Sequence, residues 1–409
     1  MQIKIPSSVT LIDKYAFQGC TSLKDIFIPS SVKQIKKCAF DKISILNITG
    51  SIMSIPDRMF SGCKSLIQIS IPSSVKIIGE YAFEQCQSLK TVILSKSLTK
   101  IGSCAFSYCE SLMQITIPSS VKSIGFRAFY RCSSLTQIVI PSSITEICGG
   151  LFRECSRLTQ ITIPSSVTKI CGDAFEKCLN LKEITIPSSV TEILGCAFSE
   201  CSSLEKISEL TSVQMIDYKC FYKCSKLTQI SMPSIMYIGD YTFEGCSSLT
   251  QIHISSSLER IGNCIFKGIK RLDISGSVQK IFNKMFFECH SLVQISLPSS
   301  IKSIGSNAFY QCLSLQQITI PSSVTSIQSY AFCSCSSLIQ ITIPSSVKSI
   351  GESAFYGCSS LARISIPSSI TKIGDNAIIN CSSLLQITIP ASLNIDKIGL
   401  NSNVQILRI

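Results

Sequence analysis

The sequence repeats itself with a period of 23 residues. Proline, or a residue that takes its place, recurs from Pro6 to Pro390, and fourteen of the seventeen spacings are 23 residues. A phenylalanine holds the same place in sixteen of seventeen repeats, with Ile378 as the exception. A fixed period of this length is typical of solenoids, in which each repeat buries its apolar face only against its neighbours. The length of 409 residues therefore does not indicate several globular domains.

Each repeat contains two apolar segments and one turn region. In a representative repeat, residues 315–320 end in an alternation of apolar and polar side chains, which is the pattern of a half-buried strand. Pro321 ends this strand because it cannot donate a hydrogen bond to a neighbouring strand. Residues 324–327 offer two further inward side chains for a second short strand. Residues 331–335 place Phe and Cys three positions apart, which fits one helical turn on the convex side.

Three spacings depart from the period. Two repeats have 20 residues, at 29–48 and 255–274, and both lack the Cys-x-x-Leu segment. A third loses one Ser after Pro233. We expect these deletions to fall in turns while the apolar columns stay in register. The sequence thus predicts a single solenoid over 1–409 with about 17 repeats of 23 residues, and an irregular C-terminal cap over 391–409.

Composition argues against several functional classes. No stretch of 18 apolar residues occurs, so we expect no membrane span, and the start lacks the apolar segment of a secretory signal. The net charge of +12 is spread along the chain, so it favours anionic partners only weakly and does not indicate nucleic-acid binding. His253 and His290 have no partners at catalytic or metal-site spacing. We therefore expect no enzyme activity, no cofactor and no metal site.

Most cysteines occupy one column of the repeat. Three interpretations remain open for this column: a buried ladder of free thiols, disulfides between neighbouring coils, and metal ligation. Side chains in one column point the same way, and their number is odd, so the thiol ladder is favoured. The fifteen cysteines are Cys20, Cys63, Cys86, Cys109, Cys132, Cys155, Cys178, Cys201, Cys224, Cys246, Cys289, Cys312, Cys335, Cys358 and Cys381.

The repeat unit Leu-x-x-Ile-x-Ile-Pro-Ser-Ser-Val-x-x-Ile-Gly-x-x-Ala-Phe-x-x-Cys-Ser-Ser resembles the BspA-like leucine-rich repeats of bacteria and protists. The resemblance covers about residues 2–393. It implies an α/β-type solenoid: a leucine-rich-repeat arc with a long parallel β-sheet on the concave face, short second strands and one-turn helices on the convex side. Pro-x-Ser stands where common leucine-rich repeats have an Asn ladder.

The same resemblance implies a surface-associated binding or adhesion role toward host proteins, extracellular matrix or other microbes. It brings no catalytic residue. Cell-surface location follows from the family, and a cytoplasmic location is the alternative because the chain shows neither a signal peptide nor a membrane span. An intracellular scaffold for protein partners is accordingly the second functional hypothesis.

The outward side chains of the main strand form the predicted ligand face. Glutamine and threonine dominate this face, which either recognises an extended protein or glycan or stabilises the sheet through hydrogen bonds among its own side chains. Irregular strands are the better candidates for specificity. The candidate ligand residues are Gln68, Gln114, Gln137, Gln160, Gln229, Gln251, Gln294, Gln317, Gln340, Gln386, Phe27, Lys206, His253 and Arg271.

The N-terminal repeat opens directly on a strand, at residues 2–5, with no polar cap before it. An open edge strand invites pairing with another chain. We therefore expect either a truncated chain or end-to-end self-association through this uncapped coil.

Overall fold

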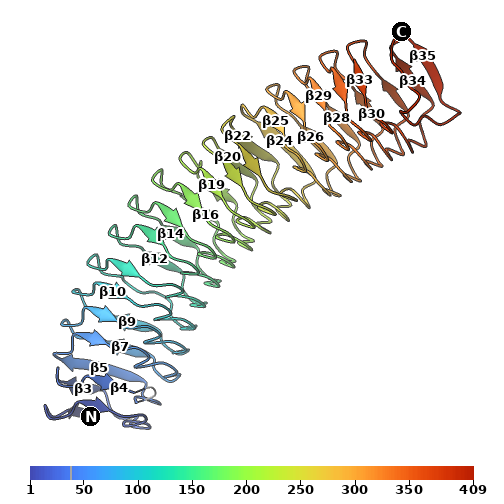
Figure 1. Cartoon of the computed structure of the whole chain (residues 1–409). Coiled ribbons are helices and arrows are strands. Elements are labelled where there is room, and N and C mark those ends of the chain that lie inside the picture. Colours follow the sequence, from blue (N-terminus) through green and yellow to red (C-terminus); the bar gives the residue numbers. More distant parts are fainter. Residues whose placement is uncertain (37–38) are drawn as a thin grey trace. The chain divides into compact units, whose positions relative to one another are not determined.

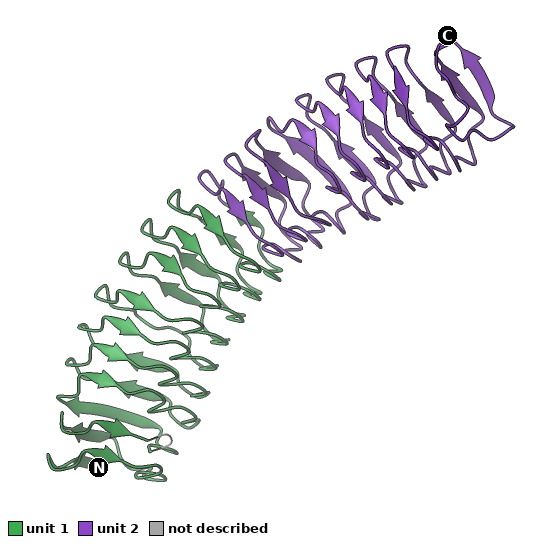
Figure 2. Cartoon of the chain, in the orientation of Figure 1, with its two compact units in different colours: residues 1–207 green, residues 208–409 purple. Residues whose placement is uncertain are grey.

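The computed structural model describes residues 1–36 and 39–409 and is a parallel β-solenoid. The chain forms two compact units, Met1–Ile207 and Ser208–Ile409, shown in green and purple in Figure 2. In each unit, a regular coil carries a main strand and a short second strand, and successive main strands stack in chain order (Figure 1). The described residues include no α-helix, so none is long and apolar enough to cross a membrane.

In unit 1 the main strands pair in parallel with those of neighbouring coils. They are β1 (Gln2–Lys4), β3 (Asp25–Ile28), β5 (Ile45–Gly50), β7 (Gln68–Ser70), β9 (Thr91–Ile93), β12 (Gln137–Val139), β14 (Gln160–Thr162), β16 (Glu183–Ile184) and β18 (Lys206–Ile207). The second strands are β2 (Leu11–Ile12), β4 (Gln34–Ile35), β6 (Ser54–Ile55), β8 (Ile77–Ile78), β10 (Lys100–Ile101), β11 (Ser123–Ile124), β13 (Glu146–Ile147), β15 (Lys169–Ile170) and β17 (Glu192–Ile193).

In unit 2 the main strands form one nine-stranded parallel sheet, which confirms the predicted long sheet. They are β20 (Gln229–Met232), β22 (Gln251–Ile254), β24 (Arg271–Ser275), β26 (Gln294–Ser296), β28 (Gln317–Thr319), β30 (Gln340–Thr342), β32 (Arg363–Ser365), β34 (Gln386–Ile389) and β35 (Gln405–Arg408). The second strands are β19 (Met215–Ile216), β21 (Tyr237–Ile238), β23 (Arg260–Ile261), β25 (Lys280–Ile281), β27 (Ser303–Ile304), β29 (Ser326–Ile327), β31 (Ser349–Ile350) and β33 (Lys372–Ile373).

The core of each unit is a set of stacked apolar columns. The Phe column is the largest, and Phe83, Phe106 and Phe129 are fully buried. Neighbouring rings stack nearly parallel, with centroids 5.1 Å apart for Phe83–Phe106 and 5.5 Å for Phe106–Phe129. These separations suit offset stacking of aromatic rings. Each coil therefore obtains much of its stability from the coils on both sides, as the repeat pattern predicts.

The abundant serines have a structural role between coils. After each proline the chain makes a tight turn, in which the N–H of Val324 donates to the carbonyl oxygen of Pro321 at 3.0 Å. The second Ser of this turn donates its hydroxyl to a carbonyl of the preceding coil, as Ser323 does to Ile301 at 2.6 Å. The Ser column thus satisfies backbone acceptors that a buried loop would otherwise leave unpaired.

The prediction of one-turn helices on the convex side is wrong. The segment from the second strand to the Cys column, here called the turn segment, forms tight turns instead. Tyr330 and Ser334 flank Phe332 with φ values of 59° and 58°, and left-handed residues interrupt a right-handed helix. The N–H of Phe332 donates across to Ala354 of the next coil at 2.8 Å, whereas that of Cys335 donates back to Phe332 at 3.2 Å. Backbone N–H groups of the turn segment therefore bond both within their own tight turn and to the next coil, and no helix forms.

The register of the main sheet shifts by two residues at the first short repeat. Asn47 in β5 lies opposite Asp25 of β3 on one side and opposite Ser70 of β7 on the other. Asp25 is four residues before its proline position and Ser70 only two. The expectation that the apolar columns keep their register is thus wrong for the main strands here, whereas the Phe column continues through Phe40. An even shift nevertheless preserves which side chains face inward.

The second short repeat repeats this shift. Asp273 in β24 lies opposite Gln251 of β22 and opposite Ser296 of β26. Gly276 follows β24 with a φ of 100°, and a Cβ there would overlap the carbonyl oxygen of Ile254 in the preceding coil. Glycine is therefore required where the shifted strand approaches its neighbour.

Candidate functional site

The main-strand face consists of the outward side chains of the main strands in each unit. In unit 1 it contains Gln68, Gln137 and Gln160, and Gln114 holds the equivalent place in a coil that forms no main strand; all four are exposed, and Gln137 lies directly opposite Gln160. In unit 2 the candidate glutamines are Gln229, Gln251, Gln294, Gln317, Gln340 and Gln386. Gln317 and Gln340 are in register, whereas the shifted β24 places Asp273 beside Gln251 and Arg271 beside Gln294. The Gln column is therefore interrupted rather than continuous.

Self-pairing of the ladder is sparse among the described residues. One side-chain hydrogen bond joins a candidate glutamine to another glutamine, from Gln386 Nε2 to Gln405 Oε1 at 3.2 Å. The threonines directly before these glutamines do bond between coils. Thr159 donates its hydroxyl to the carbonyl oxygen of Thr136 at 3.1 Å. Most glutamine amides consequently face solvent with donors and acceptors available to a ligand.

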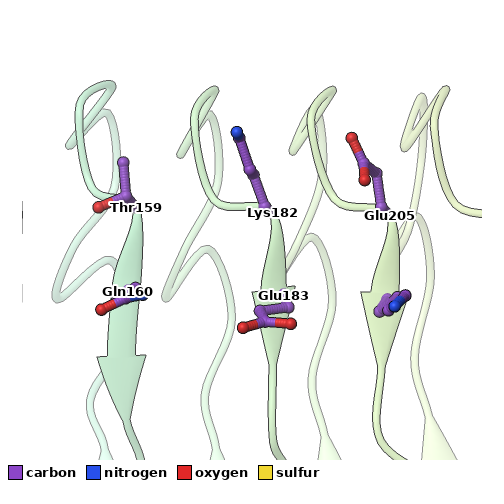
Figure 3. A pocket seen from close by; sticks show the side chains of 6 residues that line it. Thr159, Gln160, Lys182, Glu183 and Glu205 are labelled. Atoms are coloured by element: carbon purple, nitrogen blue, oxygen red, sulfur yellow. The ribbon is translucent and has the colours of Figure 1, made fainter.

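A square of alternating charges lies on the main-strand face of unit 1. Lys182 directly precedes β16, which begins at Glu183, and Glu205 directly precedes β18, which begins at Lys206 (Figure 3). Glu183 is in register with Lys206, and the N–H of Glu205 donates to the carbonyl of Lys182 at 2.8 Å. Every charge thus has an opposite charge beside it both along the strand and across to the next coil. These four residues, with Thr159 and Gln160, line a groove of about 360 Å³.

The structure places the other irregular strands in separate environments. The Nζ of Lys4 lies 5.5 Å from the ring centroid of Phe27, and Asn47 donates to Asp25 at 3.0 Å nearby. His253 lies between Ser231 and Ser275 of its neighbouring strands, with Nδ1 at 3.2 Å from Ser275 Oγ. Among the described residues, no group of three His, Cys, Asp or Glu side chains could hold a metal ion.

Sequence reasoning missed a set of exposed apolar side chains on the main-strand face of unit 1. Ile93, Met113 and Val139 are 52%, 55% and 72% exposed. Val139 lies among Gln114, Gln137 and Gln160 in a groove of about 440 Å³. The sequence did contain a sign of this set, because Ile93 and Val139 stand two residues before the proline position, where most repeats have Thr or Ser. Large apolar side chains gathered on an outward face are characteristic of interaction surfaces.

The cysteine column is a buried ladder of thiols that form no disulfides, as predicted, with Cys20 only partly buried. Cys109 and Cys132 donate to the carbonyl oxygens of Phe83 and Phe106, both at 3.2 Å. Burial raises the pKa of the Cys109 thiol well above its ordinary value, and the charges of neighbouring thiolates would raise it further. These thiols are therefore poor nucleophiles, because the thiolate is the reactive form.

Comparisons with known proteins agree on the repeat type. The family profile described as "BspA type Leucine rich repeat region (6 copies)" matches residues 1–74, 53–179, 145–273 and 279–404. A leucine-rich repeat protein from Bacteroides ovatus is 29% identical, with 100% of this chain and 92% of that chain covered and a TM-score of 0.60. A leucine rich cell surface protein from Faecalibacterium prausnitzii is 30% identical, with 82% of each chain covered and a TM-score of 0.46.

A search among curated proteins gives no match. The family profile nevertheless spans almost all of the chain, and the 23-residue unit, the parallel main strands and the stacked Phe and Cys columns recur along both units. The chain belongs to the BspA-type leucine-rich repeat family.

Proposed function

We propose that this chain is a non-enzymatic binding protein that recognises a protein ligand through the main-strand face of unit 1, as part of cell-surface recognition of host, matrix or microbial partners. The observation that carries the proposal is the exposure of Ile93, Met113 and Val139 on a sheet face whose other side chains are mainly polar. Leucine-rich repeats are a protein-interaction scaffold, and surface location follows the family resemblance.

The chemistry of this face suits a protein partner. Val139 is 72% exposed within the Gln-lined groove, so a partner that covers it removes apolar surface from water. Burial of such a side chain contributes roughly 1–2 kcal/mol. Gln137 and Gln160 beside it offer amide donors and acceptors to a polypeptide backbone or to polar side chains. The charge square at Lys182–Lys206 would then select partners by electrostatic complementarity.

The test compares binding of the purified chain to a panel of extracellular-matrix proteins and to intact host cells. Val139→Lys places a charge at the most exposed member of the apolar group, and we expect it to weaken binding by about ten-fold or more, which corresponds to 1.4 kcal/mol. Gln85→Lys is the matched control, because it adds the same charge at an exposed position in the turn segment of the same unit. Equal binding by both variants would contradict the proposal.

One observation favours the second candidate function, an intracellular scaffold that uses the same face. No disulfide joins the cysteines that the structure describes. Secreted proteins often carry disulfides, whereas the cytosol keeps thiols reduced. Labelling of intact cells with a reagent that does not cross membranes separates the two candidates. Labelling of the chain supports surface recognition, and its exclusive recovery from the cytosol supports the scaffold.

A further inference from the structure

The turn segments of unit 1 carry a row of alternating aromatic and arginine side chains. The guanidinium of Arg127 lies 4.8 Å from the ring centroid of Phe126 and 5.3 Å from that of Tyr130. The guanidinium of Arg131 lies 5.7 Å from Tyr130 and 5.3 Å from Tyr108. These five residues, here called the aromatic–arginine row, therefore place each guanidinium between two rings within the range of cation–π attraction.

The next coil is shaped to hold one end of this row. Gly149 and Gly150 are the chain's one Gly-Gly pair. A Cβ at Gly149 would lie 3.2 Å from two ring atoms of Phe126, and a Cβ at Gly150 would lie 2.8 Å from Cγ of Arg127. The ring of Phe126 and the stem of Arg127 thus rest on backbone without side chains beneath them. A side chain at either glycine would displace the ring or the arginine stem from its stacked position.

The two arginines differ in charge compensation. Arg131 pairs with Glu154, which also accepts a hydrogen bond from Tyr130 at 3.2 Å. Burial raises the pKa of Glu154, but the hydrogen bond and the charge of Arg131 outweigh it and hold that pKa below its usual value. Among the residues that the structure describes, no acidic side chain pairs with Arg127. The row therefore presents one uncompensated guanidinium beside the exposed ring of Phe126, which is 48% exposed.

We propose that the aromatic–arginine row binds the sulfate or carboxylate groups of an anionic polysaccharide. A stacked guanidinium keeps its edge donors in a fixed fork that matches a planar or tetrahedral oxyanion. The exposed part of the Phe126 ring offers an apolar surface for the C–H groups of a sugar ring. This function goes beyond protein recognition by the main-strand face and uses different residues.

A repeating polymer is the ligand that fits best, because the partly buried guanidinium of Arg127 binds a single anion weakly and linked anions bind with avidity. Unit 2 carries a cluster of its own, in which Lys219 and Lys223 lie 5.3 and 4.9 Å from the ring of Tyr222. The net charge of +12 further favours a polyanion over a neutral glycan. We favour a polysaccharide over an acidic polypeptide because no strand edge forms part of the row.

The experiment measures binding of the full chain to heparin and to hyaluronan at several salt concentrations. Poly-glutamate and anionic lipid vesicles serve as the polypeptide and membrane arms. We expect Arg127→Gln to weaken polysaccharide binding roughly ten-fold and to lower its salt dependence. Arg157→Gln is the matched control, because Arg157 is an exposed arginine in the following repeat that lies outside the row. It should bind as the unaltered chain does.

Two further variants keep the proposal open to refutation. Arg127→Lys retains the charge but loses the planar fork, so binding intermediate between the unaltered chain and Arg127→Gln supports the row. Phe126→Ala removes the ring and should also weaken binding, and it replaces Arg127→Gln if that variant fails to fold. Equal losses in Arg127→Gln and Arg157→Gln would show attraction by overall charge and overturn the proposal. Tighter binding to poly-glutamate or to vesicles would overturn it as well.

Discussion

The thiol of Cys109 donates a hydrogen bond to the carbonyl oxygen of Phe83, 3.2 Å away in the preceding coil. The same bond joins Cys132 to Phe106 and Cys155 to Phe129. The Cys column is therefore part of the hydrogen bonding between coils as well as of the apolar core. The carbonyl of Phe83 also accepts the backbone N–H of Cys86 at 3.2 Å, so the thiol supplies a second donor, from the next coil, to one buried acceptor.

This arrangement predicts a sharp difference in thiol reactivity. Cys109 and Cys132 are fully buried and have raised pKa values, so both burial and low thiolate content protect them from alkylation. Cys20 and Cys104 are only partly buried. We expect iodoacetamide at pH 7.5 to modify Cys20 and Cys104 long before the two buried thiols, as followed by peptide mass spectrometry. Early modification of Cys109 in the folded chain would contradict the buried ladder.

The thiols also predict a loss of stability at alkaline pH. Burial holds the pKa of Cys109 well above 9.0 in the folded chain, whereas the unfolded thiol keeps its ordinary value. The unfolded state therefore loses protons first, and the free energy of unfolding falls as pH rises past about 9, by at most roughly 1.4 kcal/mol per pH unit for each thiol. Thermal unfolding between pH 7 and 10.5 measures this slope. Cys109→Ala should show a shallower slope, and an unchanged slope would exclude a contribution from this thiol.

The sequence was sufficient to predict the coil because each position within the 23-residue period has the same structural role in successive repeats. The positions of Ile318, Pro321 and Phe332 within the period fix the strand, its end and the core column, and each has one physical reason. The turn segment was mispredicted because a Phe–Cys spacing of three fits both a helical turn and a pair of left-handed turns. The choice depends on hydrogen bonds to the next coil, such as that from Phe332 to Ala354, which no local pattern encodes.

The candidate site was predictable only in part for the same reason. The alternation of strand residues placed Gln137 and Gln160 on the outward face, where the structure has them. The aromatic–arginine row joins Tyr108 to residues 126–131 of the next repeat, and its rings meet across a coil boundary. Such a contact depends on side-chain conformations, which the 23-residue period leaves open.

The register shift at the first short repeat depends on Gly50. Its φ is 115°, and a Cβ at this position would overlap the carbonyl oxygen of Ile28. We expect Gly50→Ala to destabilise the first coils by more than about 2 kcal/mol, because strain and overlap add. Gly19→Ala is the control: its φ is 75° with no atom near the added Cβ, so only the conformational cost of about 1 kcal/mol remains. Hydrogen exchange of the amides in β3 and β5 measures the loss of stability in each variant. An equal loss in Gly50→Ala and Gly19→Ala would show that the overlap at Gly50 is relieved without cost.

A final prediction concerns the left-handed residues of the turn segments. Gln85 is exposed, has a φ of 60°, and donates its N–H to Ser107 of the next coil at 2.8 Å. A non-glycine residue costs roughly 1–2 kcal/mol in this conformation, which glycine adopts freely but with a greater loss of chain entropy on folding. Gln85→Gly should therefore raise the local free energy of unfolding by up to about 1 kcal/mol, measured as slower hydrogen exchange at this amide. Thr91→Gly, in β9, should have the opposite effect, and faster exchange in both variants would show that the turn segment stores no strain at Gln85.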